Sequence, residues 1–221
     1  GWSCVLVARR RERLERLAAE LGGEFAVCDV ADRRQVEEVA ARHPEVKLLV
    51  CNAGIPGRGR VLEQDEETIR RVLDVDYLGN VWTLRAFLPA LERAAPSHVV
   101  NVVSVAGTVS LPPASAYVAA KHAQLAFSRA VAAELRPRGV RVHTVNPGFV
   151  DTEGFPNRER FGAFGRFVIG PQRVAEHVLR TLERGRAETY VPGWYRAGAV
   201  VEGLAPGLLA RLLARGRSRK M

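Results

Sequence analysis

The sequence has no long apolar run and few cysteines, and each shortage excludes a class of protein. No stretch of about 18 apolar residues occurs, so the sequence predicts no membrane-spanning helix. The three cysteines, Cys4, Cys28 and Cys51, match no metal-ligand spacing, and their odd number does not suggest a disulfide framework. We therefore expect no metal site, and buried thiols in a reducing, cytoplasmic compartment.

Lysine is also scarce: only three of the 33 basic residues are lysines, and the net charge is +9. A basic chain suggests nucleic-acid binding, but most of the arginines alternate with glutamates along helical patterns, so we expect no nucleic-acid partner. One region has basic residues without acidic ones. This tail is either solvated or contacts a membrane surface or another anionic partner, and it contains Arg211, Arg215, Arg217, Arg219 and Lys220.

The remaining composition fits one α/β domain, because 221 residues with 47% hydrophobic content are enough for a buried sheet with helices on both sides. Short valine-rich runs alternate with helical patterns. These runs show little polar alternation, which is typical of parallel strands buried on both faces. The predicted strands are Ser3–Val7, Glu24–Cys28, Val46–Cys51, His98–Val103, Val140–Val145 and Glu188–Val191.

Helical patterns lie between these strands. Arg11–Leu21 carries an apolar stripe at i, i+3, i+4 and i+7, formed by Leu14, Leu17, Ala18 and Leu21. Two longer stretches cover Glu66–Ala95, where Pro89 should kink or end the helix, and Ser115–Arg138. Repeated strand–helix–strand units predict a doubly wound parallel sheet in a three-layer α/β/α sandwich. We expect residues 1–195 to form this domain and residues 196–221 to form a C-terminal helix and basic tail.

Tyr117 and Lys121 stand four residues apart in a helical pattern, so their side chains share one face of the helix. A nearby ammonium favours the phenolate form of a tyrosine, and such a tyrosine can exchange a proton with a carbonyl or alcohol oxygen. The alternative is an exposed tyrosine that packs on a lysine stem.

Small or polar residues follow four of the predicted strands. Asp29 ends the second strand and Ser104 ends the fourth, while Asn52-Ala53-Gly54 and Asn146-Pro147-Gly148 follow the third and fifth. In a parallel sheet, ligands bind at the carboxyl ends of the strands. The sequence therefore predicts a ligand site at one edge of the sheet.

These residues together resemble the short-chain dehydrogenase/reductase family, and the match covers about residues 1–195. The resemblance implies a Rossmann-like fold and hydride transfer between a nicotinamide cofactor and a carbonyl or secondary alcohol. Tyr117 would be the general acid/base, Ser104 would orient the substrate oxygen, and Lys121 would hold the nicotinamide ribose and assist Tyr117. The other implied cofactor contacts are Asp29 and Val30 at the adenine, Asn52, Ala53 and Gly54 beneath the adenosine, and Pro147, Gly148 and Thr152 at the nicotinamide.

The cofactor preference follows from charge. Family members that use NAD usually have an acidic residue after the second strand, where it binds the ribose 2′-hydroxyl. Here that position is Ala8, followed by Arg9 and Arg10, and arginine binds a 2′-phosphate well. We therefore expect NADP(H), although both arginines also fit an ordinary arginine-rich helix start.

The family's glycine-rich phosphate loop is absent from this sequence. By the resemblance, about 25–30 residues with a central strand and that turn would precede the first strand seen here. We therefore expect a sheet without its first βα unit and with two unpaired edges. We also expect this chain to be a fragment of a longer one and to bind nucleotide weakly or not at all.

The family usually has an asparagine where this chain has Asp76, and that asparagine supports a water in a proton relay from the lysine. An aspartate could hold the same water, but its charge would oppose the phenolate form of Tyr117. Asn80, one helical turn later, could partly replace the asparagine.

The resemblance also implies a homodimer or homotetramer formed through the two long helices. Four phenylalanines in Asp151–Gly170 suggest either core cover or a lid, over Glu153–Phe167, for a lipophilic carbonyl or alcohol substrate. A non-catalytic scaffold or regulatory protein with this fold is the alternative function. The combination of Ser104, Tyr117 and Lys121 argues against it, because a scaffold has no need of all three.

Overall fold

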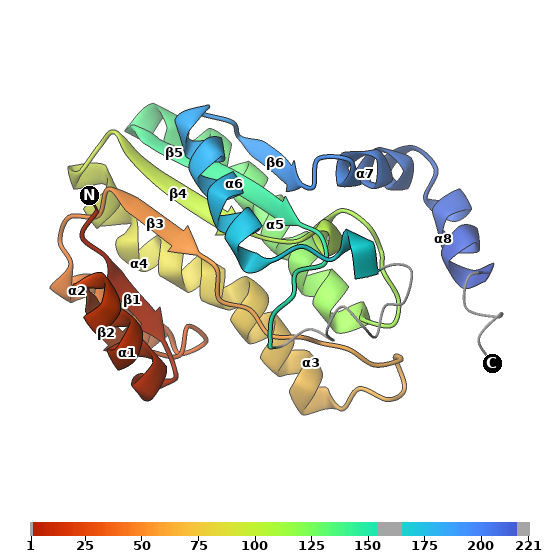
Figure 1. Cartoon of the computed structure of the whole chain (residues 1–221), viewed down its shortest axis with the longest axis horizontal. Helices are drawn as coiled ribbons and strands as arrows, with labels where there is room; N and C mark the ends of the chain where they lie inside the picture. The colour runs from red at the N-terminus through yellow and green to blue at the C-terminus, as the bar shows by residue number, and fades with distance from the viewer. Residues whose placement is uncertain (1, 154–164, 216–221) are drawn as a thin grey trace.

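The sheet of this protein is divided into two parts in the computed structural model, which describes residues 2–153 and 165–215. In the smaller part, β1 (Val5–Ala8) pairs in parallel with β2 (Glu24–Val27). The larger part is a parallel sheet in the order β3-β4-β5-β6. Its strands are β3 (Leu48–Cys51), β4 (Ser97–Val102), β5 (Val140–Pro147) and β6 (Glu188–Val191). The β1–β2 pair lies alongside β3 without hydrogen bonding to it (Figure 1).

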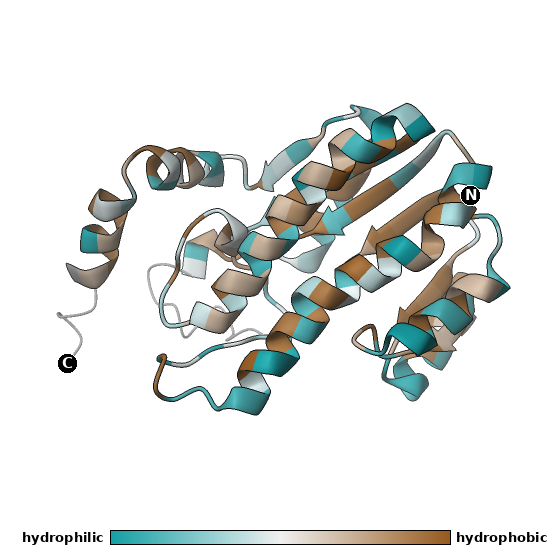
Figure 2. Ribbon diagram, turned by 180° about the vertical axis from the view of Figure 1, so that it is seen from behind, coloured by the Kyte–Doolittle hydropathy of each residue, from teal (hydrophilic) through white to brown (hydrophobic). Residues whose placement is uncertain are grey.

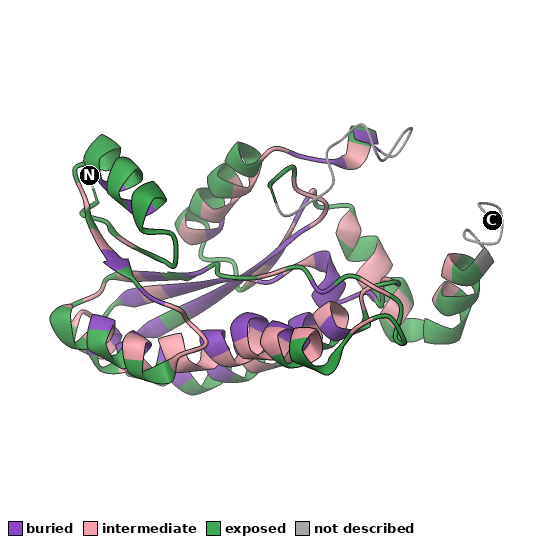
Figure 3. Cartoon of the chain, turned by 90° about the horizontal axis from the view of Figure 1, so that it is seen from below, coloured by how far each residue is buried: buried purple, intermediate pink, exposed green. Residues whose placement is uncertain are grey.

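Helices cover both faces of the sheet, which confirms the predicted three-layer α/β/α sandwich (Figure 3). One layer contains α2, α4 and α5, and the other contains α1 and α6. The helices are α1 (Arg11–Leu21), α2 (Arg33–Arg42), α3 (Glu66–Leu73), α4 (Gly79–Arg93), α5 (Ser115–Leu135), α6 (Pro171–Glu183), α7 (Tyr195–Leu204) and α8 (Pro206–Arg215). None of the described helices is by itself long and apolar enough to cross a membrane.

The core lies on both faces of the strands. On one face, α2, α4 and α5 bury Val39, Leu91 and Leu135 against strand residues such as Val99. On the other face, α6 packs over a smaller cluster that includes Val145. The sequence predicted this arrangement because its valine-rich strands have no polar face.

The break in the sheet leaves strand residues exposed, as expected for unpaired edges. Val7 on β1 is 40% exposed and Val50 on β3 is 47% exposed, although both lie within strands. The predicted apolar stripe of α1 is only half correct, because Leu14 and Ala18 are buried whereas Leu17 and Leu21 are exposed. Among the described residues, no strand pairs with the edge of β1 or β3 that faces the break.

The first long helical stretch differs from the prediction. It divides into α3, a π-helical turn at Asp74–Leu78, and α4, and α4 continues past Pro89 to Arg93. The helix does not end at the proline because the residues after it, Ala90 and Leu91, are buried in the core. A π turn adds one residue to a helical turn and often occurs at functional sites.

A row of buried polar side chains connects the two central strands to the two long helices. Asn80 of α4 donates to Asn101 of β4 over 3.0 Å, and Asn101 donates to Ser128 of α5 over 2.8 Å. Ser128 in turn lies 2.6 Å from the hydroxyl of Thr144 on β5. All four are buried, so each bond satisfies a polar group that water cannot reach. This row fixes α4 and α5 against the strands whose ends carry the candidate site.

The cysteines are free, as expected, but only two of them are buried. Burial raises the pKa of the Cys28 thiol to about 11 and that of the Cys51 thiol to about 12. Cys4 is exposed, so the expectation of burial was wrong for it, because β1 lies at the break in the sheet.

Candidate active site

Ser104 follows the carboxyl end of β4, where it caps a short 3-10 turn, Val105–Gly107. The backbone N–H of Ala106 donates to the Ser104 Oγ over 3.1 Å, and this leaves the serine O–H available to donate to another oxygen. The turn packs closely on α5, since a Cβ added at Gly107 would lie 2.8 Å from the backbone oxygen of Lys121. The turn after Ser104 is therefore held against the helix that carries Tyr117 and Lys121.

Tyr117 and Lys121 lie on the same face of α5, as their spacing predicted. The Lys121 Nζ is 5.6 Å from the centre of the Tyr117 ring, and Lys121 is only 3% exposed. Tyr117 is half-buried, so its phenol can be reached from solvent while the ammonium beneath it is enclosed. A positive charge held here out of water acts on the phenol more strongly than it would at the surface.

Asp76 is the direct partner of that ammonium. Its Oδ1 lies 3.2 Å from the Lys121 Nζ, and the Ile55 backbone N–H donates to both carboxylate oxygens over 3.2 and 3.3 Å. Lys121 also donates to Gln124 Oε1 over 2.9 Å. Burial raises the pKa of Asp76, and the charge of Lys121 opposes that rise. Asn80 does not take this place, because its side chain donates to Asn101.

Asn52, Ala53 and Gly54 form an exposed loop after β3, which is the surface predicted to lie beneath the adenosine. The structure gives a reason for glycine at position 54 that lies within the protein itself. A Cβ added at Gly54 would lie 2.5 Å from Asp76 Oδ1 and 3.4 Å from Lys121 Nζ. Glycine is therefore required here by the buried ion pair.

This geometry makes Gly54→Ala a test of the ion pair. The added methyl displaces the Asp76 carboxylate, so we expect a loss of about 1–3 kcal/mol in the free energy of unfolding, the usual cost of overpacking. Urea denaturation measures it. Gly193→Ala is the matched control, because nothing lies within 4 Å of a Cβ at Gly193. Equal effects of the two variants would contradict this reading.

Asp29 and Val30 follow β2, at the end of the strand as predicted, but both already have protein partners. The Asp29 carboxylate pairs with Arg71 of α3 and accepts the Ala31 N–H over 3.0 Å. Val30 packs against Gly79 at the start of α4. These contacts join the β1–β2 unit to the helices that carry Asp76.

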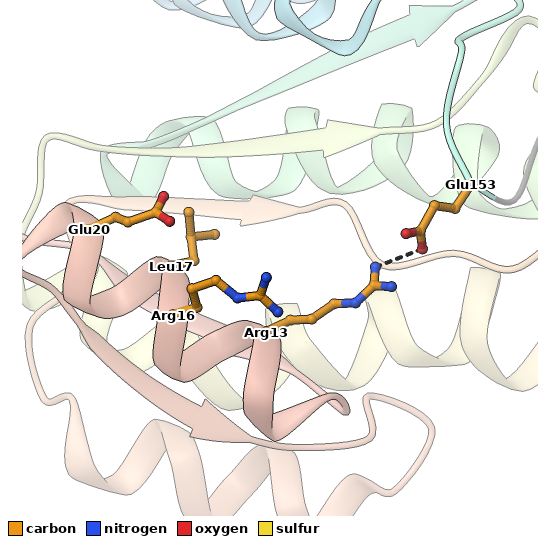
Figure 4. Close-up of a pocket in the computed structure, with 5 residues that line it drawn as sticks. All are labelled: Arg13, Arg16, Leu17, Glu20 and Glu153. Atoms are coloured by element: carbon orange, nitrogen blue, oxygen red, sulfur yellow. Dashed lines mark hydrogen bonds and ion pairs between the residues drawn. The ribbon is translucent and has the colours of Figure 1, made fainter.

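Arg9 and Arg10 are exposed at the carboxyl end of β1. Arg10 pairs with Glu153 over 3.1 Å, and Arg13 of α1 pairs with the same carboxylate over 2.6 Å. Figure 4 shows Arg13 reaching Glu153 across a shallow pocket, which is also lined by Arg16, Leu17 and Glu20. Thr152, beside Glu153, is exposed. These ion pairs connect α1 to the segment after β5.

Pro147 ends β5, and Gly148 follows it, where its N–H donates to the Val191 carbonyl over 2.9 Å. The space that a side chain at Gly148 would fill is taken by the ring of Tyr195. That ring stacks on Trp194 at 3.8 Å between centroids, and Trp194 meets Phe167 edge-on at 5.4 Å. An aromatic wall therefore borders this end of the site, and no periodic pattern in the sequence predicts it.

Arg58 is a second cation near Tyr117 that the motif analysis did not identify. Burial lowers the pKa of Arg58, and its charge interaction with Tyr117 opposes that effect, so the two groups are close enough to interact. Arg58 comes from the irregular segment after β3, which has no periodicity that could have revealed it. The predicted lid, Glu153–Phe167, falls mostly on residues 154–164, outside the described residues.

Comparisons with known proteins agree with this geometry. Residues 1–161 match the family model described as short chain dehydrogenase. The chain is 33% identical to "Dehydrogenase/reductase SDR family member 7B" of Xenopus laevis, over 99% of this chain and 76% of that protein.

Two solved structures are also similar. A short chain dehydrogenase from Burkholderia cenocepacia J2315 in complex with NADP has a TM-score of 0.77 and 27% identity, and the match covers 96% of this chain and 97% of that one. The alcohol dehydrogenase from the archaeon Thermococcus sibiricus, complexed with 5-hydroxy-NADP, has a TM-score of 0.74 and 31% identity, with 86% and 85% coverage. Together with the family model and the relative, they show that the chain belongs to the short-chain dehydrogenase/reductase family of oxidoreductases.

Proposed function

We propose that this site transfers hydride between NADP(H) and a carbonyl or secondary alcohol, with Tyr117 as the general acid/base. The observation that carries the proposal is the enclosed ammonium of Lys121, 5.6 Å from the Tyr117 ring, on the helix that packs against the turn after Ser104. A phenol, an ammonium and a hydroxyl at the carboxyl edge of a parallel sheet are the groups that such a reaction needs.

Each side chain has a defined part in the reduction. Ser104 donates its O–H to the carbonyl oxygen and fixes its position, because its Oγ already accepts the Ala106 N–H. Tyr117 gives its phenolic proton to the same oxygen as negative charge develops there. Lys121 stabilises the phenolate that remains. When bound, the nicotinamide supplies the hydride in reduction and accepts it in oxidation.

The residues present fit the 2′-phosphate of such a cofactor better than its pyrophosphate. The loop at Asn52–Gly54 is exposed at the sheet edge, and Arg9 and Arg10 offer guanidinium groups for a 2′-phosphate. No described residue supplies a glycine-rich turn at a helix N-terminus, which is where a pyrophosphate is usually held.

We therefore expect this 221-residue chain to bind NADPH weakly. A dissociation constant above about 0.1 mM, in the weak part of the usual range for enzyme ligands, is the predicted result of a fluorescence titration. Saturable binding at low micromolar concentration would contradict it. The break between β1 and β3 is the structural reason, because ligands in this fold bind where the strand order reverses.

A preference for NADP(H) over NAD(H) is supported by Arg9, by the absence of an acidic residue after β1, and by two similar structures in complex with NADP or 5-hydroxy-NADP. We expect Arg9→Glu to lower kcat/KM for NADPH by about 10- to 100-fold, the effect of losing a charge-assisted hydrogen bond. The value for NADH should change little. An equal fall for both cofactors would contradict the assignment of Arg9.

We further propose a class of substrate for this site. The aromatic wall of Phe167, Trp194 and Tyr195 favours a lipophilic carbonyl or alcohol, as does the phenylalanine content of the segment after β5. The test is a panel of aliphatic, aromatic and steroid-like ketones with millimolar NADPH, followed by the loss of cofactor absorbance. We expect turnover of the apolar ketones. Turnover of none of them would favour the alternative, a non-catalytic protein of this fold.

We also propose that the chain forms a homo-oligomer. Sedimentation measures its oligomeric state.

A further inference from the structure

α7 and α8 form an arm that extends from one end of the molecule, away from the β1–β2 pair (Figure 1). The base of the arm is fixed to the domain, because Glu202 of α7 accepts a 2.6 Å hydrogen bond from Ser110, in the loop after Ser104. A Cβ at Gly198 would lie 3.5 Å from Val109 in the same loop. α8 continues beyond this attachment, so its sides are available to a partner.

The arm exposes more large apolar side chains than its attachment to the domain can cover. Leu204 is 83% exposed, Leu208 is 55% exposed and Leu212 is 52% exposed. Leu208 and Leu212 are four residues apart in α8, so they form one stripe along the helix, while Leu209 and Leu213 are half-buried. Figure 2 shows hydrophobic residues along both helices of the arm. A contiguous apolar surface of this kind marks an interaction site.

The charge of the arm indicates what covers this stripe. Glu202, the only acidic residue from 195 onward, is turned toward the domain by its bond with Ser110. Arg211 is exposed next to Leu212, and the sequence continues with Arg215, Arg217, Arg219 and Lys220. Exposed leucines with arginines and no acidic residue fit an anionic lipid surface, where the apolar stripe enters the headgroup boundary and the cations meet lipid charge.

The shape of the arm favours contact with a surface over insertion through it. Tyr195–Leu204 and Pro206–Ala214 together have the length and apolarity of a span, but the two helices are bent by 117° at Ala205. A bend of this size places α7 and α8 in different directions, so one helix can lie flat while the other remains attached to the domain. We propose that α8 docks on the surface of membranes that contain anionic lipids, through Leu208, Leu212 and Arg211.

Vesicle flotation with the full chain tests this proposal. Vesicles of phosphatidylcholine alone are compared with vesicles that contain about one quarter phosphatidylglycerol, at low and high salt. We expect binding to the anionic vesicles only, with release at high salt. Leu208→Glu and Leu212→Glu should each lower the partition coefficient by about tenfold or more, since each adds a negative charge to the apolar stripe.

Leu179→Glu is the matched control, because Leu179 of α6 is 54% exposed, almost the same as Leu208, but lies outside the arm. It should bind vesicles as the unmodified protein does, and circular dichroism confirms that all variants fold. The proposal is overturned by no binding to anionic vesicles, by equal binding to neutral ones, or by equal loss with Leu179→Glu. It is also overturned if vesicles bind neither the unmodified protein nor Leu208→Glu, and Leu208→Glu abolishes self-association in sedimentation. The stripe is then a contact between copies of the chain.

Discussion

Replacing Tyr117 with phenylalanine is expected to lower kcat by about 10²- to 10⁴-fold, the usual contribution of a positioned general acid. The substitution removes one hydroxyl and keeps the ring, so the packing of α5 and the site of Lys121 should be retained. The fall should appear in both directions of the reaction, because the group that donates a proton in reduction accepts it in oxidation. Initial rates with millimolar NADPH and the best ketone of the panel measure it.

Tyr77→Phe is the control for this variant. Tyr77 packs edge-on to Phe127 at 6.3 Å, and the substitution keeps that aromatic contact. We expect its activity to stay close to that of the unmodified protein. A Tyr117→Phe variant with more than about a tenth of the original kcat would show that another group supplies the proton.

Asp76→Leu is expected to lower the free energy of unfolding by about 3–5 kcal/mol, because it leaves the buried ammonium of Lys121 without its counter-charge. The side chains of Asp76 and Lys121 are 0% and 4% exposed, so water cannot replace the lost partner. Asp76→Asn should not lower the free energy of unfolding at neutral pH, since its amide oxygen can still accept from Lys121 or from the Ile55 N–H and the cost of burying a carboxylate is removed. Urea denaturation of the two variants gives the comparison, and equal losses would contradict this account.

The stability of this protein changes with pH in a direction that follows from the pKa of Asp76. Because burial raises the pKa of Asp76, the folded chain holds that proton more tightly than the unfolded chain does. The contribution of this group to stability is therefore greatest below its unfolded pKa and falls as pH rises through its folded pKa. At low pH Asp76 is neutral, like asparagine. The difference in stability between the unmodified protein and Asp76→Asn should thus shrink as pH falls from the folded pKa of Asp76 and disappear below its unfolded pKa.

The expected effect of Asp76 on kcat differs from its effect on the free energy of unfolding. Its charge opposes the phenolate form of Tyr117, so we expect Asp76→Asn, once folded, to have equal or higher kcat. A hundredfold loss, about 2.7 kcal/mol of barrier, would show that Asp76 has a catalytic role of its own.

The sequence predicted the regular elements well because their signals are local. The six predicted strands correspond to β1–β6 with small shifts at their ends, and Arg11–Leu21 and Glu188–Val191 match α1 and β6 at both ends. Tyr117 and Lys121 could be paired from sequence because both lie on one helix, four residues apart.

The parts that the sequence did not predict depend on contacts between distant residues. The π-helical turn at Asp74–Leu78 has no sequence signal, yet it carries the residue that meets Lys121, 45 positions later. The close contact between Gly54 and Asp76 could not be predicted for the same reason, since Asp76 comes from another element. Leu17 fits a helical stripe but is exposed, because nothing described covers the sheet at that point.

The proposed hydride transfer is tested most directly by isotope transfer. The protein is incubated with millimolar NADPH deuterated at the transferable position, together with the ketone panel, and the alcohol products are analysed by mass spectrometry. We expect one deuterium at the carbinol carbon of the product from the unmodified protein and almost none from Tyr117→Phe. Equal labelling by the two proteins would contradict the assignment of Tyr117, and no labelled alcohol from either would contradict the proposed function itself.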